Sequence, residues 1–160
     1  MTLLAGAVYT YWEYIDYIIV ALLALFSIKL VVKIVRKIYI LLQNHRLRGA
    51  DSMDGTSFEY YVAQLLIDRG YTNVSLTEHY DYGVDIIAEK DGIRWGIQAK
   101  RYSDLVKADA VRQVVTGLKL YECDRAMVIT NSTFSNVAKR LADGNDCVLV
   151  DRAGLYALAR

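Results

Sequence analysis

One long stretch near the start of the chain contains no charged residues. From Tyr17 to Ile28 every side chain is uncharged, and the apolar span reaches Val35 if Lys29 and Lys33 extend their stems toward the surface. This is about the length of a helix that crosses a bilayer. The pattern therefore predicts a single transmembrane helix over residues 17–35.

The two sides of this span differ in charge. No Lys or Arg precedes it, whereas six basic residues lie between Lys29 and Arg48. Aromatic side chains typical of a lipid–water interface crowd its N-terminal end, at Tyr9, Tyr11, Trp12, Tyr14 and Tyr17. The positive-inside rule then predicts a single-pass inner-membrane protein with its N-terminus outside and the rest of the chain in the cytoplasm.

Two alternatives compete with a membrane span. A cleaved signal peptide would have its positive charge before the apolar stretch and a small-residue cleavage site after it, and neither is present. A buried core helix would leave the charge asymmetry as a coincidence. After the span, an amphipathic extension through Ile38, Tyr39, Leu41 and Leu42 and a polar linker over Gln43–Asp54 are expected.

Residues 51–160 alternate between helical and strand patterns. Apolar residues at Phe58, Val62, Leu65 and Leu66 predict a helix that ends at Arg69-Gly70. The elements expected after it are strands at 73–77, 84–89 and 94–100, a helix at 107–120, a strand at 126–130, a helix at 137–142 capped by Ser135 or Asn136, a strand at 147–150 and a helical turn at 155–158. This order indicates an α/β domain, a mixed sheet flanked by helices.

The charge of this second part limits how it can bind nucleic acid. It has 13 basic and 16 acidic residues, a net charge of −3. Any contact with DNA must therefore come from a local patch and not from bulk charge. Cys123 and Cys147 have no metal-ligand spacing and are expected to be small buried hydrophobic residues.

A carboxylate, an amide and a lysine lie within one predicted hairpin. Asp85 is on its first strand, while Gln98 and Lys100 share one face of the second strand, after a turn at Asp91-Gly92. Hard oxygen ligands beside a cation are what a site needs to bind a divalent metal and hydrolyse a phosphodiester. The alternative is a solvated hairpin face without chemistry.

Short motifs in a particular order extend from about Met53 to Leu158. They are Gly55, Phe58-Glu59, Gly70-Tyr71, Tyr82-Gly83-Val84-Asp85, Gln98-Ala99-Lys100-Arg101, Val111, Gln113, Val128-Ile129-Thr130-Asn131, Phe134 and Val148-Leu149-Val150-Asp151. Together they resemble the Mrr-type branch of the PD-(D/E)xK restriction endonuclease superfamily. The resemblance implies a restriction endonuclease-like fold and a DNA endonuclease that uses Mg²⁺, with Mn²⁺ as a substitute, in restriction or defence against foreign DNA.

The resemblance also implies roles for individual residues. Asp85 becomes the metal-binding carboxylate, and Lys100 the lysine that orients or activates the attacking water. Gln98 takes the place of the second acid, and because its amide oxygen brings no charge, it should weaken metal binding. Glu59 would restore that charge as a further metal ligand. Alternatively, Glu59 closes a capping box with Thr56 as the N-cap.

Four more residues are expected to contact DNA. Arg101 and Lys107 are candidate phosphate contacts, Gln113 lies on the second helix, and Asn131 follows a buried strand. A solvent-facing position for Gln113 and a turn-forming role for Asn131 are the alternatives.

The expected protein is thus a membrane-anchored endonuclease. Residues 1–50 form the anchor and linker, and residues 51–160 form the nuclease domain. Mrr-type proteins usually pair this domain with a DNA-recognition domain, so a separate partner is expected to supply specificity, and a homodimer is left open. The alternatives are a catalytically silent nuclease-fold module that binds nucleic acid or protein at the membrane, and a membrane-anchored adaptor.

Overall fold

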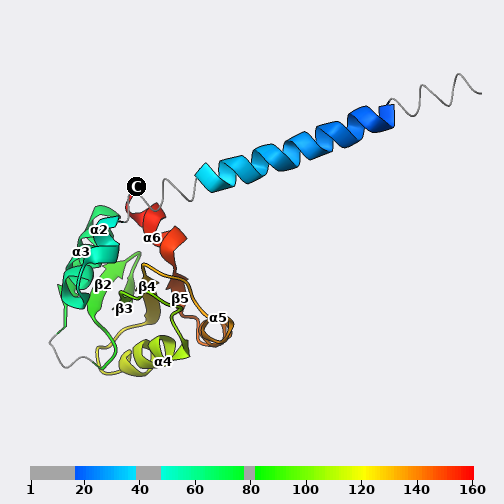
Figure 1. The fold of residues 1–160 in the computed structure, drawn as a ribbon. Helices are drawn as coiled ribbons and strands as arrows, with labels where there is room; N and C mark the ends of the chain where they lie inside the picture. The colour runs from blue at the N-terminus through cyan, green and yellow to red at the C-terminus, as the bar shows by residue number, and fades with distance from the viewer. Residues whose placement is uncertain (1–16, 39–47, 78–81) are drawn as a thin grey trace, which may run out of the picture. The chain divides into compact units, whose positions relative to one another are not determined.

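The chain divides into two units, residues 1–42 and residues 43–160. A computed structural model describes residues 17–38, 48–77 and 82–160 (Figure 1). The aromatic positions before Tyr17, the part of the amphipathic extension after Ile38 and the linker residues before Arg48 lie outside the described residues.

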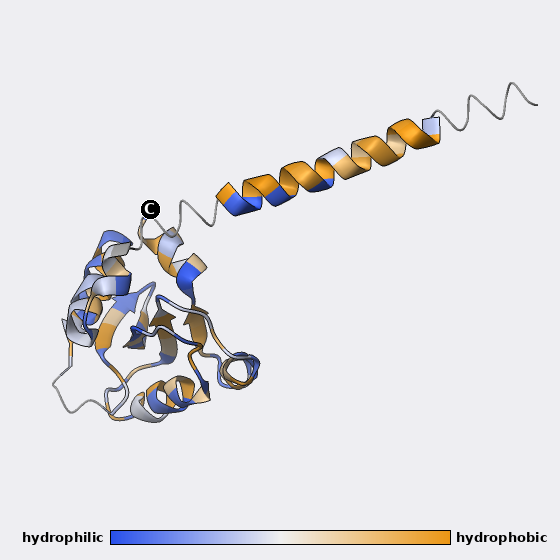
Figure 2. Cartoon of the chain, in the orientation of Figure 1, coloured by the Kyte–Doolittle hydropathy of each residue, from blue (hydrophilic) through white to orange (hydrophobic). Residues whose placement is uncertain are grey.

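The described residues of the first unit form the helix Tyr17–Ile38, of 22 residues with a mean hydropathy of 2.7. In Figure 2 this helix is coloured as hydrophobic over most of its length, and hydrophilic residues lie toward its C-terminal end. All of its side chains are exposed within this unit. By length and composition it can cross a membrane.

The second unit is built on a five-stranded sheet in the order β1-β2-β3-β4-β5. The strands are β1 (Thr72–Leu76), β2 (Ile86–Lys90), β3 (Ile93–Lys100), β4 (Arg125–Thr130) and β5 (Val148–Val150). The first three are antiparallel neighbours, and β3, β4 and β5 run parallel. The predicted mixed sheet is confirmed, with the strand of Gln98 and Lys100 at its centre.

Helices cover both faces of this sheet (Figure 1). The helices are α2 (Arg48–Ser52), α3 (Gly55–Asp68), α4 (Ala108–Gly117), α5 (Asn136–Asp143) and α6 (Arg152–Leu158). One core lies between the sheet and α3 and α6, and a second lies between the sheet and α4 and α5. Ile97 and Ala99 point into the first core, as the alternation along β3 predicts. The middle of the central strand, from Trp95 to Ala99, is therefore buried, whereas Ile93, Arg94 and Lys100 at its ends are partly exposed.

The start of the domain differs from the prediction. The polar linker expected up to Asp54 contains the short helix α2, and its Ala50 is 2% exposed in the first core. The N-cap of α3 is Asp54, whose side chain accepts a hydrogen bond from the Ser57 backbone N–H at 2.7 Å. Thr56 lies inside the helix, so the capping box that would have engaged Glu59 is wrong.

Other details follow the sequence more closely. Gly70, at φ +79°, ends α3 with the paired hydrogen bonds from Gly70 N to Ile67 O and from Tyr71 N to Leu66 O that mark a Schellman motif. Ser135, not Asn136, caps α5. Cys147 is buried, which raises the pKa of its thiol to about 11, whereas Cys123 is only half-buried.

Candidate active site

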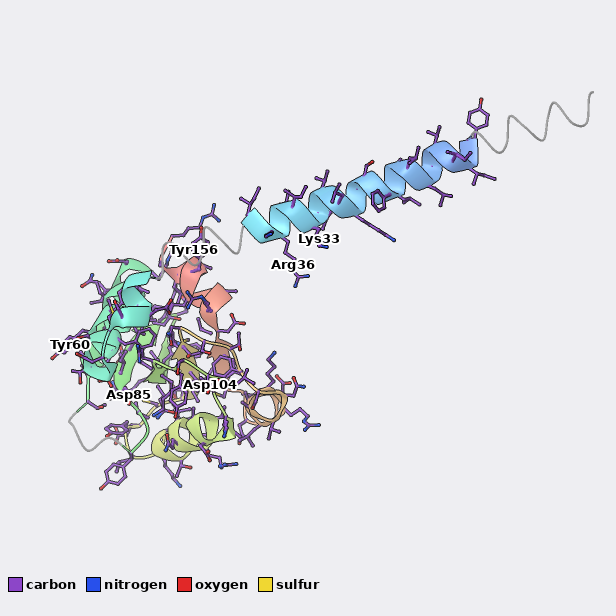
Figure 3. All side chains as sticks on the ribbon, in the orientation of Figure 1. Lys33, Arg36, Tyr60, Asp85, Asp104 and Tyr156 are labelled. Carbon is purple, nitrogen blue, oxygen red and sulfur yellow. The ribbon has the colours of Figure 1, made fainter. Side chains whose placement is uncertain are left out.

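A hollow of about 420 Å³ lies where α3, the β2–β3 hairpin and α4 meet, and Figure 3 shows Asp85 among the side chains between these elements. The four candidate catalytic residues share its wall with Gln113. Its full lining is Glu59, Tyr82, Gly83, Asp85, Gln98, Ala99, Lys100 and Gln113. Asp85 is 5% exposed and Gln98 is 1% exposed, so the alternative of a solvated hairpin face is wrong.

Asp85 is held in place by the main chain. It lies immediately before β2, where its backbone N–H donates to Ile97 O at 2.9 Å and its carbonyl accepts from Thr77 N at 3.0 Å. Its carboxylate Oδ2 accepts from the Ala99 backbone N–H at 2.7 Å. A charge-assisted bond of this length fixes the direction of the carboxylate. One of its oxygens is thereby anchored on β3, between Gln98 and Lys100.

The segment before Asp85 is pressed against α4. Gly83 has φ +86°, and a Cβ at this position would lie 2.6 Å from the backbone carbon of Gln113. From the other side, a Cβ on Gly117 would lie 2.5 Å from Tyr82 O. Only glycine fits such a backbone conformation and such close approach together. These two glycines set the distance between the Asp85 segment and the helix that bears Gln113.

Gln98 links the lysine to α4. Its amide satisfies its surroundings when Nε2 donates to Ala110 O at 2.7 Å and Oε1 accepts from Lys100 Nζ at 3.2 Å, and this orientation is assigned from the hydrogen-bonding pattern. The side-chain amide of Gln113 lies 3.1 Å from the side-chain amide of Gln98. The amide oxygen of Gln98 thus faces the ammonium of Lys100.

Glu59 comes from α3, on the opposite side of the hairpin from α4. Its side chain is partly buried and lines the same hollow as Asp85, Gln98 and Lys100. Within the described part of the chain, no three Asp, Glu, His or Cys side chains gather as a metal-binding group. A cation here would therefore need the neutral oxygen of Gln98 beside the two carboxylates, and three hard oxygen donors suit a divalent metal.

The candidate DNA contacts are divided among neighbouring hollows. Lys107 and Gln113 line a hollow of about 320 Å³ that shares Lys100 and Gln113 with the catalytic one. Arg101 and Asn131 line a third, of about 390 Å³. Lys107, Gln113 and Arg101 are exposed, but Asn131 is 5% exposed. Its amide bonds within the protein, so it is the least suited of the four to reach a phosphate.

Sequence reasoning missed an ion pair beside this third hollow. Arg152 binds the carboxylate of Asp51 through both terminal nitrogens, at 2.7 Å each. This bond lowers the pKa of Asp51 and raises the pKa of Arg152. The two residues are 101 positions apart, and no local pattern in the sequence indicates such a pair.

Comparisons with known proteins bear on the family and on the fold. The family model Mrr_cat, described as a restriction endonuclease, matches residues 50–159. Among curated proteins, none matches the sequence. One similar solved structure is AF1548, a protein of unknown function, with 21% identity, a TM-score of 0.54 and 62% of each chain covered.

Two restriction endonucleases have similar structures. The DNA modification-dependent restriction endonuclease AspBHI shares 15% identity at a TM-score of 0.56, covering 74% of this chain and 34% of that one. MspJI restriction endonuclease, in complex with a 27-mer oligonucleotide, shares 18% identity at a TM-score of 0.55, covering 74% and 30%. The chain thus spans about a third of these two proteins and 62% of AF1548. Likeness at these identities supports the restriction endonuclease-like fold.

Proposed function

The chain belongs to the Mrr_cat family of restriction endonucleases, whose model matches residues 50–159, and we propose that it cleaves the phosphodiester bonds of DNA. The proposed site of cleavage is the hollow that contains Asp85, and the proposed role is restriction of foreign DNA. The observation that supports this proposal most directly is the convergence of Glu59, Asp85, Gln98 and Lys100 on one hollow from α3, the segment before β2, and β3. Acidic and basic groups are costly to bring together out of water unless they serve one another or a ligand.

The proposed cofactor is a divalent cation, Mg²⁺ with Mn²⁺ as a substitute. Asp85, Gln98 and Glu59 would hold it, since their oxygens are of the kind that such ions prefer. When bound, the ion polarises a phosphoryl oxygen and eases deprotonation of a water. The neutral Gln98 leaves the site one negative charge poorer than three carboxylates would, so we expect weak binding of the ion.

We propose that Lys100 stabilises the negative charge that develops on the phosphoryl oxygens during cleavage. Its ammonium lies 3.2 Å from Gln98 Oε1, which orients it into the hollow. A fixed cation in a partly buried site stabilises such charge more than a mobile one in water. Asp85 contributes a carboxylate whose direction is set by the Ala99 N–H before substrate arrives.

Lys107, Gln113 and Arg101 are the proposed contacts to the DNA backbone on either side of the hollow. Phosphate contacts of this kind position a duplex but carry no sequence information. We propose that specificity comes from a separate partner.

The helix Tyr17–Ile38 is the proposed membrane anchor. Its apolar composition and the basic residues toward its C-terminal end favour an orientation with the nuclease domain in the cytoplasm. The anionic inner leaflet repels DNA. An anchored nuclease would therefore act mainly on DNA that is brought to the membrane, for example on entry into the cell.

Cleavage of plasmid DNA with Mg²⁺, and with a chelator instead, tests the proposal. Lys100→Ala and Asp85→Asn should each reduce cleavage by at least about a hundredfold, and Asp85→Asn should also weaken Mn²⁺ binding in calorimetry. Lys100→Ala should change the free energy of unfolding by less than about 1 kcal/mol, because its side chain is only partly buried. A parent chain that never cuts DNA would favour the silent-module alternative, and a Lys100→Ala variant that cuts like the parent would exclude the assigned role.

A further inference from the structure

The backbone around and after Lys100 is held by two side chains from strand β4 and its C-terminal end, and by a bond from the segment's own Arg101 to the backbone of α2. Thr130 Oγ1 donates to Lys100 O at 2.6 Å, and Arg101 Nη2 donates to Asp51 O at 2.6 Å. Tyr102 N donates to Asn131 Oδ1 at 2.8 Å. Strand β3 ends at Lys100, so these bonds take over where its pairing with β4 stops.

The direction of the Asn131 amide depends on Asp51. Asn131 Nδ2 donates to Asp51 Oδ1 at 3.0 Å, and an ionised carboxylate can only accept. The opposite end of the amide, Oδ1, is thereby turned toward the Tyr102 N–H. Without the carboxylate the amide could rotate and present its NH₂ to that N–H, which would leave a partly buried donor without an acceptor.

Arg152 holds the carboxylate itself. Its guanidinium binds both oxygens of Asp51 at 2.7 Å, and its Nη1 also donates to Asn131 O at 2.8 Å. A planar, bidentate pair fixes geometry as well as charge. Asp51 therefore meets the segment after Lys100 in two ways, through its own carbonyl and through Asn131.

We propose that Asp51 is a positioning residue for the catalytic lysine: through Asn131 and Arg101 it fixes the main chain that follows Lys100, and with it the place of the Lys100 ammonium in the hollow. This inference rests on the proposed function of that hollow. It gives helix α2, which follows the N-terminal helix in the sequence, a role in the chemistry and not only in the connection.

The test uses the full-length chain and two substitutions, Asp51→Asn and Asp51→Ala. The matched control is Glu89→Ala, which removes the Glu89–Arg94 ion pair at the other end of the hairpin. The two pairs are similarly accessible: the side chains of Glu89 and Arg94 are 36% and 39% exposed, and those of Asp51 and Arg152 are 39% and 22% exposed. Hydrogen exchange of peptides covering residues 100–104 and 86–98, kcat and KM for DNA cleavage, and calorimetric Mn²⁺ affinity are measured for each chain.

In both Asp51 variants, exchange over residues 100–104 should rise about tenfold or more, while exchange over residues 86–98 stays as in the parent. The kcat should fall about ten- to hundredfold, with KM and Mn²⁺ affinity within about twofold, because the lysine is displaced and the metal ligands are not. Glu89→Ala should leave kcat, KM, Mn²⁺ affinity and exchange over residues 100–104 unchanged, because its ion pair lies at the far end of the hairpin. If one Asp51 variant fails to fold, the other decides.

Unchanged exchange over residues 100–104 would overturn the inference, and so would faster exchange with an unchanged kcat. A fall in Mn²⁺ affinity equal to the fall in kcat would also overturn it, since the effect would then be a general loosening of the site. A parent chain that cuts no DNA would instead refute the proposed function. The exchange measurement would then still decide whether Asp51 holds the segment after Lys100.

Discussion

Gly83 is the residue whose replacement should damage the site most sharply for the smallest chemical change. In Gly83→Ala the added Cβ would lie 2.6 Å from the backbone carbon and from the Cβ of Gln113. Backbone atoms cannot rotate away as the end of a side chain can. Overpacking of this kind costs about 1–3 kcal/mol, and a non-glycine residue at positive φ costs a further 1–2 kcal/mol or so. The expected loss of unfolding free energy is therefore about 2–5 kcal/mol.

Gly92→Ala provides the control for the backbone conformation alone. Gly92 has φ +76°, close to the +86° of Gly83, but nothing lies within 4 Å of its added Cβ. This variant should lose only about 1–2 kcal/mol. The difference between the two variants then measures the close contact with α4, about 1–3 kcal/mol, or a gap in melting temperature of about 4 °C for each kcal/mol in a domain of this size.

The close contact between Gly83 and α4 should also affect DNA cleavage. To relieve the overlap, either the segment before Asp85 or helix α4 must move, and both line the hollow. We expect Gly83→Ala to reduce cleavage well below its melting temperature, while Gly92→Ala cuts like the parent. Thermal melts followed by circular dichroism, with plasmid cleavage at a temperature where both variants are folded, provide the measurements. Equal melting temperatures for the two variants would refute this account of the glycine.

Three further predictions concern the metal, the pH and the chain's N-terminal part. Gln98→Glu should tighten Mn²⁺ binding in calorimetry but lower stability by about 1–3 kcal/mol, because the NH₂ that donates to Ala110 O is lost; unchanged affinity would mean that this side chain is no ligand. The bond from Arg152 lowers the pKa of Asp51 below its ordinary 3.8. The pair should therefore stabilise the parent above pH 3.8, and this stability should be lost as the pH falls through the lowered pKa. In thermal melts, Asp51→Asn should lose less stability than the parent on acidification. Removing residues 1–47 should leave cleavage in vitro unchanged, whereas removal through residue 53 should impair folding because it deletes α2. In cells, a reporter fused to the C-terminus should be cytoplasmic and one fused to the N-terminus should be outside. The reverse result would refute the topology.

The order of helices and strands was predictable because each element has its own hydrophobic period. The apolar positions of α3, for example, recur every three or four residues, and Gly70 marks the end of that helix. The choice of N-cap was not predictable in the same way. Asp54 and Thr56 are both good caps, and only the extended backbone of Asp54 shows which of them stands outside the helix.

The burial of Gln98 could not be predicted from its own strand. Alternating polar and apolar residues are typical of a strand with one face in water, but β3 is the central strand and α4 covers its polar face. Likewise, α2 has too few residues to show a period. Its place in the fold is set by Ala50 in the core and by Arg152, far away in the sequence. A local sequence pattern does not indicate contacts between residues so far apart.

The bond between Asp85 and the Ala99 N–H has a consequence for how freely this protein can vary. The last paired residues at that end of the hairpin are Ile86 and Ile97, and the carboxylate accepts from the backbone N–H of Ala99, two residues further along β3. Every amino acid except proline offers such a donor at that position. Substitutions around the site can therefore accumulate without misdirecting the acid, provided that the hairpin keeps its register; a shift of one residue would misdirect it without changing any side chain of the site.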